Sequence, residues 1–308
     1  MSNNHLLIDI GGTATKVVVA TDGVVVNRTE LQSYKPQPTN PYTDELCKAL
    51  GSWLASVNKT LLVPSFALLG VAGVWDALER QQYLNSFTDS WLAYVGDQVP
   101  RCSVLSDVEL VHFAAFGSAP GIVLIAGTGS IAVSRESNGV IQRCGGWGPR
   151  IDDAGSGFWI GKKALLAVAR ELDGRGPATL LRRPVAAHVR VDENNNNALS
   201  AAIRQMADSR AARLAPAVLQ YASEGDTVAT EIMLSAVHAL CEQVIALLTN
   251  TVQQTTTVCL HGSLFNNKAF ATMVSSELQK QSRVQEIQVM NNLLEQAAHR
   301  LQSSSQEL

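Results

Sequence analysis

The chain has 308 residues, of which 46% are hydrophobic and 17% are charged, and its formal net charge is −3. This length is enough for two domains with separate cores, and the composition excludes a disordered chain. The small, mixed charge gives no basic surface for nucleic acid, and five scattered cysteines without a C-x-x-C pair indicate neither a zinc site nor a disulfide framework.

The first predicted element is a hairpin over residues 6–20, built around a glycine-rich turn. An apolar strand enters the turn Gly11-Gly12-Thr13 and a second apolar strand leaves it. Glycines at such a turn let the backbone amides approach an anion closely, and phosphate is the usual anion. Asp9, at the end of the first strand, can hydrogen-bond the amides of the turn.

Helices and further strands follow this hairpin. The segment 43–57 is predicted to be a helix with Thr43 as its N-cap, because apolar residues recur at three- and four-residue steps. Further helices are expected at 78–95 and 107–116, and further strands at 24–26, 66–73 and 102–105. This order of elements predicts a mixed sheet with helices packed on it.

A second glycine-turn hairpin begins after residue 120. Its strands are predicted at 122–125 and 131–134, and its turn is Gly127-Thr128-Gly129. Two such hairpins predict two related halves that grip one phosphate chain, although either turn alone could be an ordinary hairpin turn. Neither turn is a Walker A loop or a Gly-x-Gly-x-x-Gly fingerprint.

The remaining sequence is mostly helical. Residues 177–197 are polar and end in four asparagines, so we expect a solvated loop there. Helices are predicted at 162–172, 198–220, 226–252, 269–281 and 293–301, and strands at 140–143, 256–261 and 284–290.

Two acidic positions have both a structural and a functional interpretation. Asp107 follows a strand and opens a helix, so it can favour the helix dipole or cap the turn, or it can serve as a general base. Asp153 and Trp147 lie in a glycine-rich loop, which favours a functional role. The alternative for this loop is a core tryptophan beside a surface acid.

Together these motifs resemble a known superfamily. Residues 9–16 (Asp-Ile-Gly-Gly-Thr-Ala-Thr-Lys) and 125–130 (Ile-Ala-Gly-Thr-Gly-Ser) are similar to the two phosphate motifs of the actin-like ATPases and sugar kinases, and residues 104–117 resemble their connecting segment. Residues 145–161 are similar to the Gly-Gly-Trp-Gly…Asp-Glu-Gly-Ser-Gly block of N-acetylglucosamine kinases, in the branch that contains the BadF/BadG/BcrA/BcrD ATPases. Ala154 stands here in place of the glutamate of that block.

The resemblance implies a fold as well as a family. We expect two α/β domains of the actin-like ATPase (ribonuclease H-like) type with an interdomain cleft. The N-terminal domain is expected at 1–118 and the C-terminal domain at 119–290. A C-terminal helix at about 291–308 is expected to pack back on the first domain.

The resemblance also implies an activity. The expected enzyme is a cytoplasmic, homodimeric kinase that uses ATP and Mg²⁺ to phosphorylate N-acetyl-D-glucosamine at the 6-hydroxyl, giving N-acetylglucosamine 6-phosphate and ADP. It is expected to bind neither nucleic acid nor a membrane. Glucosamine and N-acetylmuramic acid are alternative substrates, because one hydroxyl or acyl contact can set the preference.

Two other classes of function are open. A BadF-type activator ATPase needs cysteines for an iron–sulfur cluster, and no suitable pair follows the second turn. A sugar-binding regulator without catalysis is disfavoured because Asp9 and Asp107 are both present.

Site residues are carried over from the resemblance by position. Asp107 is the expected general base, and Asp9 is expected near Mg²⁺ through water. The expected ATP-binding residues lie in three glycine turns: Gly11, Gly12, Thr13, Lys16, Gly127, Thr128, Gly129, Gly262 and Ser263. The expected sugar-binding residues are Gly73, Asp107, Gly146, Trp147 and Asp153. Lys16 is alternatively a solvated strand residue, and residues 261–263 are alternatively a plain strand-to-helix turn.

Overall fold

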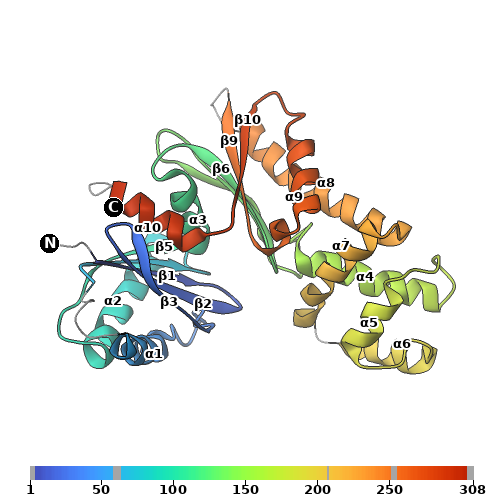
Figure 1. Ribbon diagram of the computed structural model, residues 1–308, viewed down its shortest axis with the longest axis horizontal. Helices are drawn as coiled ribbons and strands as arrows, with labels where there is room; N and C mark the ends of the chain where they lie inside the picture. Colours follow the sequence, from blue (N-terminus) through green and yellow to red (C-terminus); the bar gives the residue numbers. More distant parts are fainter. Residues whose placement is uncertain (1–3, 58–63, 207, 251–254, 304–308) are drawn as a thin grey trace. The chain divides into compact units, whose positions relative to one another are not determined.

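The computed structural model describes residues 4–57, 64–206, 208–250 and 255–303 (Figure 1). The chain divides into two compact units, one formed by Met1–Ala119 with Asn292–Leu308 and the other by Pro120–Asn291. Each unit contains one five-stranded sheet with helices, so the predicted α/β class is confirmed.

The sheet of the first unit has the strand order β3-β2-β1-β4-β5. Its central strand β1 pairs antiparallel with β2 and parallel with β4. Every residue of β4 is buried, as expected of a strand covered on both faces. The strands are β1 (Asn4–Ile10), β2 (Ala14–Thr21), β3 (Val24–Gln32), β4 (Phe66–Val71) and β5 (Arg101–Ser106).

Four helices cover the two faces of this sheet. On one face, α1 (Thr43–Ser56) and α2 (Ala77–Tyr94) share a core with alternate residues of β1 and β4. On the other face lie α3 (Asp107–Phe116) and the C-terminal helix α10 (Leu293–Ser303), which pack against each other. Arg300 of α10 donates a 2.7 Å hydrogen bond to the carbonyl oxygen of Ala115, at the end of α3.

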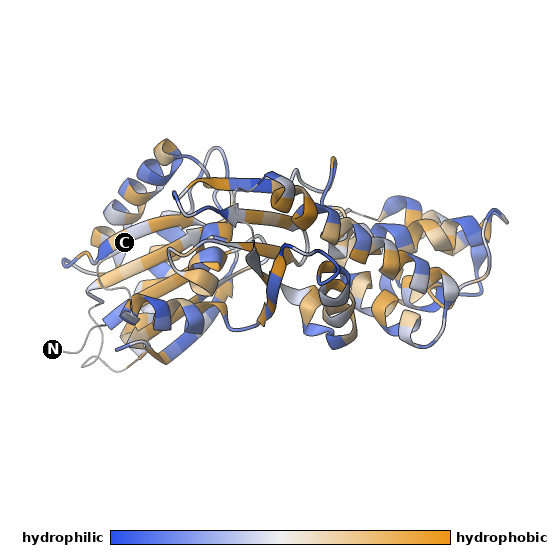
Figure 2. Ribbon diagram, turned by 90° about the horizontal axis from the view of Figure 1, so that it is seen from above, coloured by the Kyte–Doolittle hydropathy of each residue, from blue (hydrophilic) through white to orange (hydrophobic). Residues whose placement is uncertain are grey.

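The second unit repeats the arrangement of the first sheet. Its order is β10-β9-β6-β7-β8, and its central strand β6 again pairs antiparallel with the next strand and parallel with a later one. Figure 2 shows apolar residues concentrated along the strands, whereas the helices alternate between apolar and polar positions. The strands are β6 (Gly121–Ala126), β7 (Ser130–Arg135), β8 (Ile141–Gly145), β9 (Thr256–His261) and β10 (Val284–Met290).

The core helix of the second unit is α8 (Thr227–Asn250), which packs on β6, β7 and β8. Among the described residues it is also the one helix long and apolar enough to cross a membrane, but half of that stretch is buried inside the unit. The other helices are α4 (Gly157–Leu172), α5 (Arg182–Val189), α6 (Asn196–Gln205), η1 (Asp208–Leu214), α7 (Ala215–Ser223), η2 (Ser263–Asn266) and α9 (Lys268–Leu278).

Most predicted elements are confirmed within a few residues, but two regions were predicted wrongly. Strand β3 continues to Gln32, beyond the predicted strand 24–26, and the stretch between α4 and α8 also differs. The predicted loop 177–197 contains α5. The other residues of this helix are mostly polar or exposed, but Val185 and Ala186 are buried and pack the helix against the core. The predicted helix 198–220 is broken into α6, η1 and α7. Pro216 opens α7, because proline lacks the N–H that a helix interior requires.

Two helix starts also differ from the prediction. Helix α1 begins at Thr43, and Tyr42 with φ of 57° precedes it without a side-chain cap, so Thr43 is not the N-cap. Helix α4 begins at Gly157 rather than at residue 162. Its N-cap is Ser156, whose hydroxyl accepts a 3.1 Å hydrogen bond from the amide of Trp159. The predicted helix 226–252 is confirmed up to residue 250, and its last two residues lie outside the described part.

Candidate active site

The first glycine turn closes the hairpin of β1 and β2. The Gly11 amide donates to the carbonyl oxygen of Ala14 at 3.0 Å, and the Ser33 hydroxyl donates to the carbonyl oxygen of Gly11 at 2.7 Å. Gly12 and Thr13 are exposed at the tip, and a Cβ added at Gly12 would meet no atom within 4 Å. The tip therefore has the bare backbone that an anion needs for close approach.

Two carboxylates of the first unit interact electrostatically. Burial raises the pKa of Asp9 from 3.8 to about 6, with the Asp107 carboxylate adding to the rise and the Lys16 ammonium opposing it. Burial also raises the pKa of Asp107, while the hydrogen bond from the Val108 amide and the Lys35 ammonium both lower it by a smaller amount. The strands thus bring the predicted metal ligand and the predicted base together, with Lys16 paired opposite Asp9 on β2.

The N-cap of α3 is Ser106 and not Asp107. The Ser106 hydroxyl accepts from the Glu109 amide at 3.2 Å, and a Glu109 carboxylate oxygen accepts from the Ser106 amide at 2.9 Å. This capping box is complete without Asp107, whose Oδ1 accepts from the neighbouring Val108 amide at 3.0 Å. Asp107 is therefore not the cap. It lies in the first turn of α3, where an acid favours the helix dipole, and its carboxylate is not needed for the capping box.

Gly73 follows β4 in the same unit, with φ of +88°. A Cβ added there would lie 3.4 Å from Cε of Lys35, so this lysine lies beside Gly73 as well as near Asp107. A pocket of about 600 Å³ opens next to Gly73, between residues 36–41 and the start of α2. Lys35 could not be predicted from the sequence, because one exposed lysine in a proline-rich loop carries no local signal.

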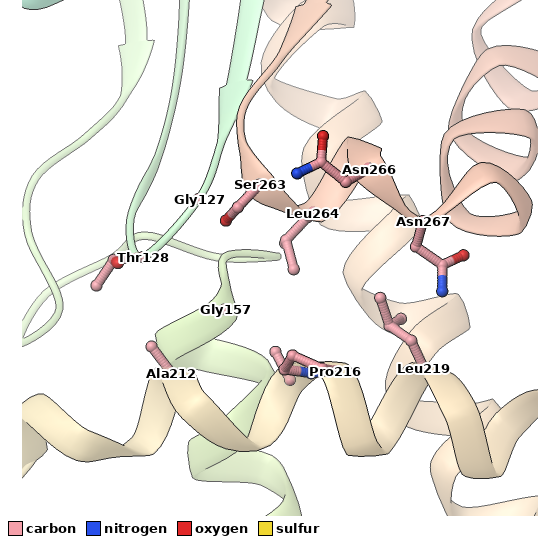
Figure 3. A pocket seen from close by; sticks show the side chains of 11 residues that line it. Gly127, Thr128, Gly157, Ala212, Pro216, Leu219, Ser263, Leu264, Asn266 and Asn267 are labelled. Carbon is pink, nitrogen blue, oxygen red and sulfur yellow. The ribbon is translucent and has the colours of Figure 1, made fainter. Parts of the chain in front are cut away.

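In the second unit, the second and third glycine turns line one pocket of about 400 Å³ (Figure 3), within the usual size range of ligand pockets. One end is formed by small and hydroxyl residues of the turns, including Thr128 and Ser263. Figure 3 shows Leu219, Asn266 and Asn267 toward the other end. The pocket therefore joins glycine turns with hydroxyl groups to an apolar wall with amide groups.

Close backbone packing shapes this pocket. The amides of Gly157 and Phe158, at the start of α4, donate to the carbonyl oxygens of Gly127 and Thr128 at 2.8 and 3.1 Å. Gly262 has φ of +117°, and a Cβ added there would lie 2.4 Å from the carbonyl oxygen of Ala126. The wall formed by α7 could not be predicted from the sequence, because no motif links residues 215–219 to the distant glycine turns.

Three predicted sugar residues also lie in this unit. Asp153 is buried with a left-handed φ of 55°, and its Oδ1 accepts from the Gly148 amide at 3.2 Å. A Cβ added at Gly129 would lie 2.8 Å from Asp153 Oδ2, so the carboxylate rests against the glycine turn. Trp147 is 62% exposed under the Arg143 guanidinium, so the core-tryptophan alternative was wrong. Gly146, with φ of +71°, packs against Ile131.

The raised pKa of Asp9 predicts that this residue opposes stability at neutral pH. Asp9→Asn should raise the free energy of unfolding of the metal-free protein at pH 7 by about 1–3 kcal/mol, because it removes a charge that burial disfavours. In the folded protein the Asp9 carboxyl keeps its proton up to about pH 6, whereas in the unfolded chain it keeps it only up to about pH 3.8. The free energy of unfolding of the wild type therefore rises as the pH falls from about 6 to 3.8. The advantage of the variant should therefore vanish near pH 4.

Urea unfolding at pH 7 and pH 4 measures this effect. A variant that is less stable than the wild type at pH 7, or a gain of equal size at both pH values, would contradict the assignment of the pKa to Asp9.

Comparison with known proteins places the chain in a family. A sequence model of the BadF/BadG/BcrA/BcrD ATPase family matches residues 7–293. Over 180 residues, 56% of this chain and 56% of the relative, the chain is 32% identical to an N-acetylmuramic acid/N-acetylglucosamine kinase of Clostridium acetobutylicum. Over 186 residues, 59% of this chain and 56% of the relative, it is 30% identical to an N-acetyl-D-glucosamine kinase of Dictyostelium discoideum. The matches thus span little more than half the length of these curated relatives.

A solved structure extends the likeness over the whole chain. The crystal structure of a candidate N-acetylglucosamine kinase from Chromobacterium violaceum aligns with a TM-score of 0.70 and 25% identity, covering 97% of this chain and 99% of that one. This likeness confirms the actin-like sugar-kinase fold class predicted from the sequence.

Proposed function

The chain belongs to the BadF/BadG/BcrA/BcrD ATPase family, and from that premise we propose that it is an ATP-dependent kinase of amino sugars. The proposed reaction moves the γ-phosphoryl group of ATP to the 6-hydroxyl of N-acetyl-D-glucosamine, giving N-acetylglucosamine 6-phosphate and ADP. The names of its relatives support the amino-sugar class. The observation that carries the proposal is the Asp107 carboxylate, which is free of the capping box and lies near Asp9.

ATP would bind through the glycine turns. Its adenosine end suits the apolar wall of the 400 Å³ pocket, and its phosphates suit the amides of Thr128 and Gly129. Gly127 would shape this turn, because its amide donates to the carbonyl oxygen of Gly129 at 2.9 Å. Gly262 and Ser263 bring the end of β9 to the same pocket, while Gly11, Gly12, Thr13 and Lys16 would supply the first turn. Phosphoryl transfer depends mainly on such positioning and on neutralising charge.

Asp9 would hold Mg²⁺. Among the described residues no cluster of three His, Cys, Asp or Glu side chains could bind a metal ion alone. Mg²⁺ does not need such a cluster, because it is usually bound by one or two carboxylates together with substrate phosphates and water. A single buried carboxylate beside a phosphate turn fits this chemistry. When bound, the ion would neutralise charge on the transferred group.

Asp107 would accept the proton of the attacking hydroxyl as that oxygen attacks the γ-phosphorus. The Lys35 ammonium favours the ionised carboxylate that this role requires.

The proposed sugar contacts are Gly73, Gly146, Trp147 and Asp153. Glucosamine and N-acetylmuramic acid stay as alternative substrates. Lys35, which lies beside Gly73, would supply a positive charge for an acidic substituent on the sugar.

A BadF-type activator ATPase is the second candidate within the family. That role needs accessible cysteines for an iron–sulfur cluster. The five cysteines here are buried or half-buried and do not form a cluster with other ligands among the described residues. Cytoplasmic location and a homodimer stay predictions.

The test of the proposed function is an ADP-release assay across N-acetylglucosamine, N-acetylmuramic acid, glucosamine, N-acetylmannosamine and glucose. We expect ADP release to require an amino sugar and to stop when a chelator removes Mg²⁺, because uncompensated phosphate charge blocks transfer. ADP release that is equal with and without sugar would favour the activator ATPase. Release that continues in excess chelator would contradict the role of the metal.

A further inference from the structure

Gln243 of α8 is a buried polar side chain that the proposed reaction does not use. It is 6% exposed, and its Nε2 donates to the Ser130 hydroxyl and to the Ala154 carbonyl oxygen, both at 3.3 Å. The Ser130 hydroxyl in turn donates to the Ala154 carbonyl oxygen at 2.9 Å. One side-chain amide therefore joins three segments: the core helix, the start of β7 and the loop before α4.

The two partners of Gln243 each follow a residue of the candidate site. Ser130 comes directly after Gly129, and Ala154 comes directly after Asp153. A Cβ added at Gly129 would lie 2.8 Å from Asp153 Oδ2, so these two residues are already in contact. The hydrogen bonds of Gln243 thus tie α8 to the residue after the glycine turn and to the residue after Asp153.

The same face of α8 supports both ends of the loop. A Cβ added at Gly145 would lie 2.7 Å from Gln243 Oε1, and one added at Gly155 would lie 2.6 Å from Cγ of Leu240. Leu240 and Gln243 are three residues apart and so lie on one side of the helix. The segment 145–155, which carries Trp147 and Asp153, is therefore seated on α8 at both of its ends.

The Gln243 side chain is only half satisfied by hydrogen bonds, because its Nε2 has partners and its Oε1 has none among the described residues. Burial of Oε1 in this state destabilises the folded protein. With an apolar side chain at 243, the Ser130 hydroxyl would still bond the Ala154 carbonyl, so neither group would lose its last partner. Residues that oppose stability in this way concentrate at functional sites.

We propose that Gln243 is a positioning residue, which holds segment 145–155 against the second glycine turn and so fixes Asp153 and Trp147 relative to the bound nucleotide. Its effect on the reaction rate rests on the proposed function. Its effect on segment 145–155 rests on the fold alone. The effect on the segment and the effect on the rate can therefore be tested separately.

The test compares Gln243→Met, which keeps the length of the side chain, with the wild type. The melting temperature should stay unchanged or rise, because an unpartnered buried oxygen is removed. Amide hydrogen exchange across residues 145–155 should become faster while exchange across α8 stays the same. With MgATP and sugar, kcat should fall by about tenfold to a hundredfold with a smaller change in the KM for ATP, as expected when the sugar is misplaced relative to ATP.

Val244→Ala is the matched control. Val244 is the next residue on α8, is fully buried and packs in the hydrophobic core. This variant should lower the melting temperature and leave both kcat and exchange across residues 145–155 unchanged. A purely structural role for Gln243 predicts that Gln243→Met behaves in the same way.

Ser130→Ala provides an independent measurement. Its effect on kcat should combine less than additively with that of Gln243→Met, because both act through the same contact. Additive effects, or wild-type exchange across residues 145–155 in Gln243→Met, would overturn the proposal. If the wild type phosphorylates no sugar, the proposed function fails, and the exchange comparison still decides the positioning role.

Discussion

Asp107→Asn should lower kcat by about 10²–10⁴-fold while the protein stays folded, because the amide keeps the shape of the carboxylate but cannot accept a proton. The KM for the sugar should change less, since the amide can still contact the hydroxyl. In the wild type, kcat/KM should fall as pH falls through the pKa of Asp107, which burial raises above the ordinary aspartate value. The variant should lack this acid limb, and steady-state ADP release over a pH series measures both effects.

Asp76→Asn is the matched control for Asp107→Asn. Asp76 also stands at a helix start, but its side chain does cap α2, accepting from the Glu79 amide at 2.8 Å. Asparagine caps as well as aspartate, so stability and kcat should both stay near wild type. A folded Asp107→Asn protein with near-normal kcat would remove the general-base assignment.

The second large effect is expected from Gly262→Ala. The added Cβ would lie 2.4 Å from the carbonyl oxygen of Ala126, at a φ of +117° that disfavours any side chain. Relief of the clash must move the end of β9 away from β6 and with it Ser263 and Leu264, which line the pocket proposed for ATP. We expect the free energy of unfolding to fall by about 2–5 kcal/mol and the affinity for ATP to fall at least about tenfold.

Gly51→Ala separates the two effects of this substitution. A Cβ at Gly51 would also lie 2.4 Å from a backbone carbonyl oxygen, that of Tyr94, but Gly51 belongs to the first unit and does not line the pocket proposed for ATP. It should therefore destabilise the protein and leave the affinity for ATP unchanged in the folded fraction. Titration calorimetry with ATP, at a temperature where both variants are folded, makes the comparison. Equal affinities in the two variants would contradict the placement of ATP beside Gly262.

The parts of the site that are local in sequence could be predicted. Each glycine turn is flanked by apolar strands, so Gly11–Thr13 and Gly127–Gly129 could be located without a structure. The strand before Asp107 and the helix after it were placed in the same way. The capping box of Ser106 and Glu109 also has a sequence signature, since serine stands three residues before glutamate. It would have excluded Asp107 as the cap.

The rest depends on contacts between distant segments. Pro216 and Leu219 reach the pocket proposed for ATP because α7 packs beside the start of α4, and no local pattern encodes this. Gln243 lies 89 residues from its partner Ala154, inside a helix whose other inward residues are apolar. Helix α5 was missed because only a few of its residues are buried, so its composition is that of a loop.

The central claim is that this chain transfers phosphate from ATP to the 6-hydroxyl of N-acetylglucosamine. A ¹H–³¹P correlation spectrum of the product formed from MgATP and N-acetylglucosamine tests it most directly. The account predicts one new sugar phosphate whose phosphorus couples to the two protons on C6, together with an equal amount of ADP. Coupling to the anomeric proton, or inorganic phosphate as the sole new phosphorus species beside ADP, would contradict it.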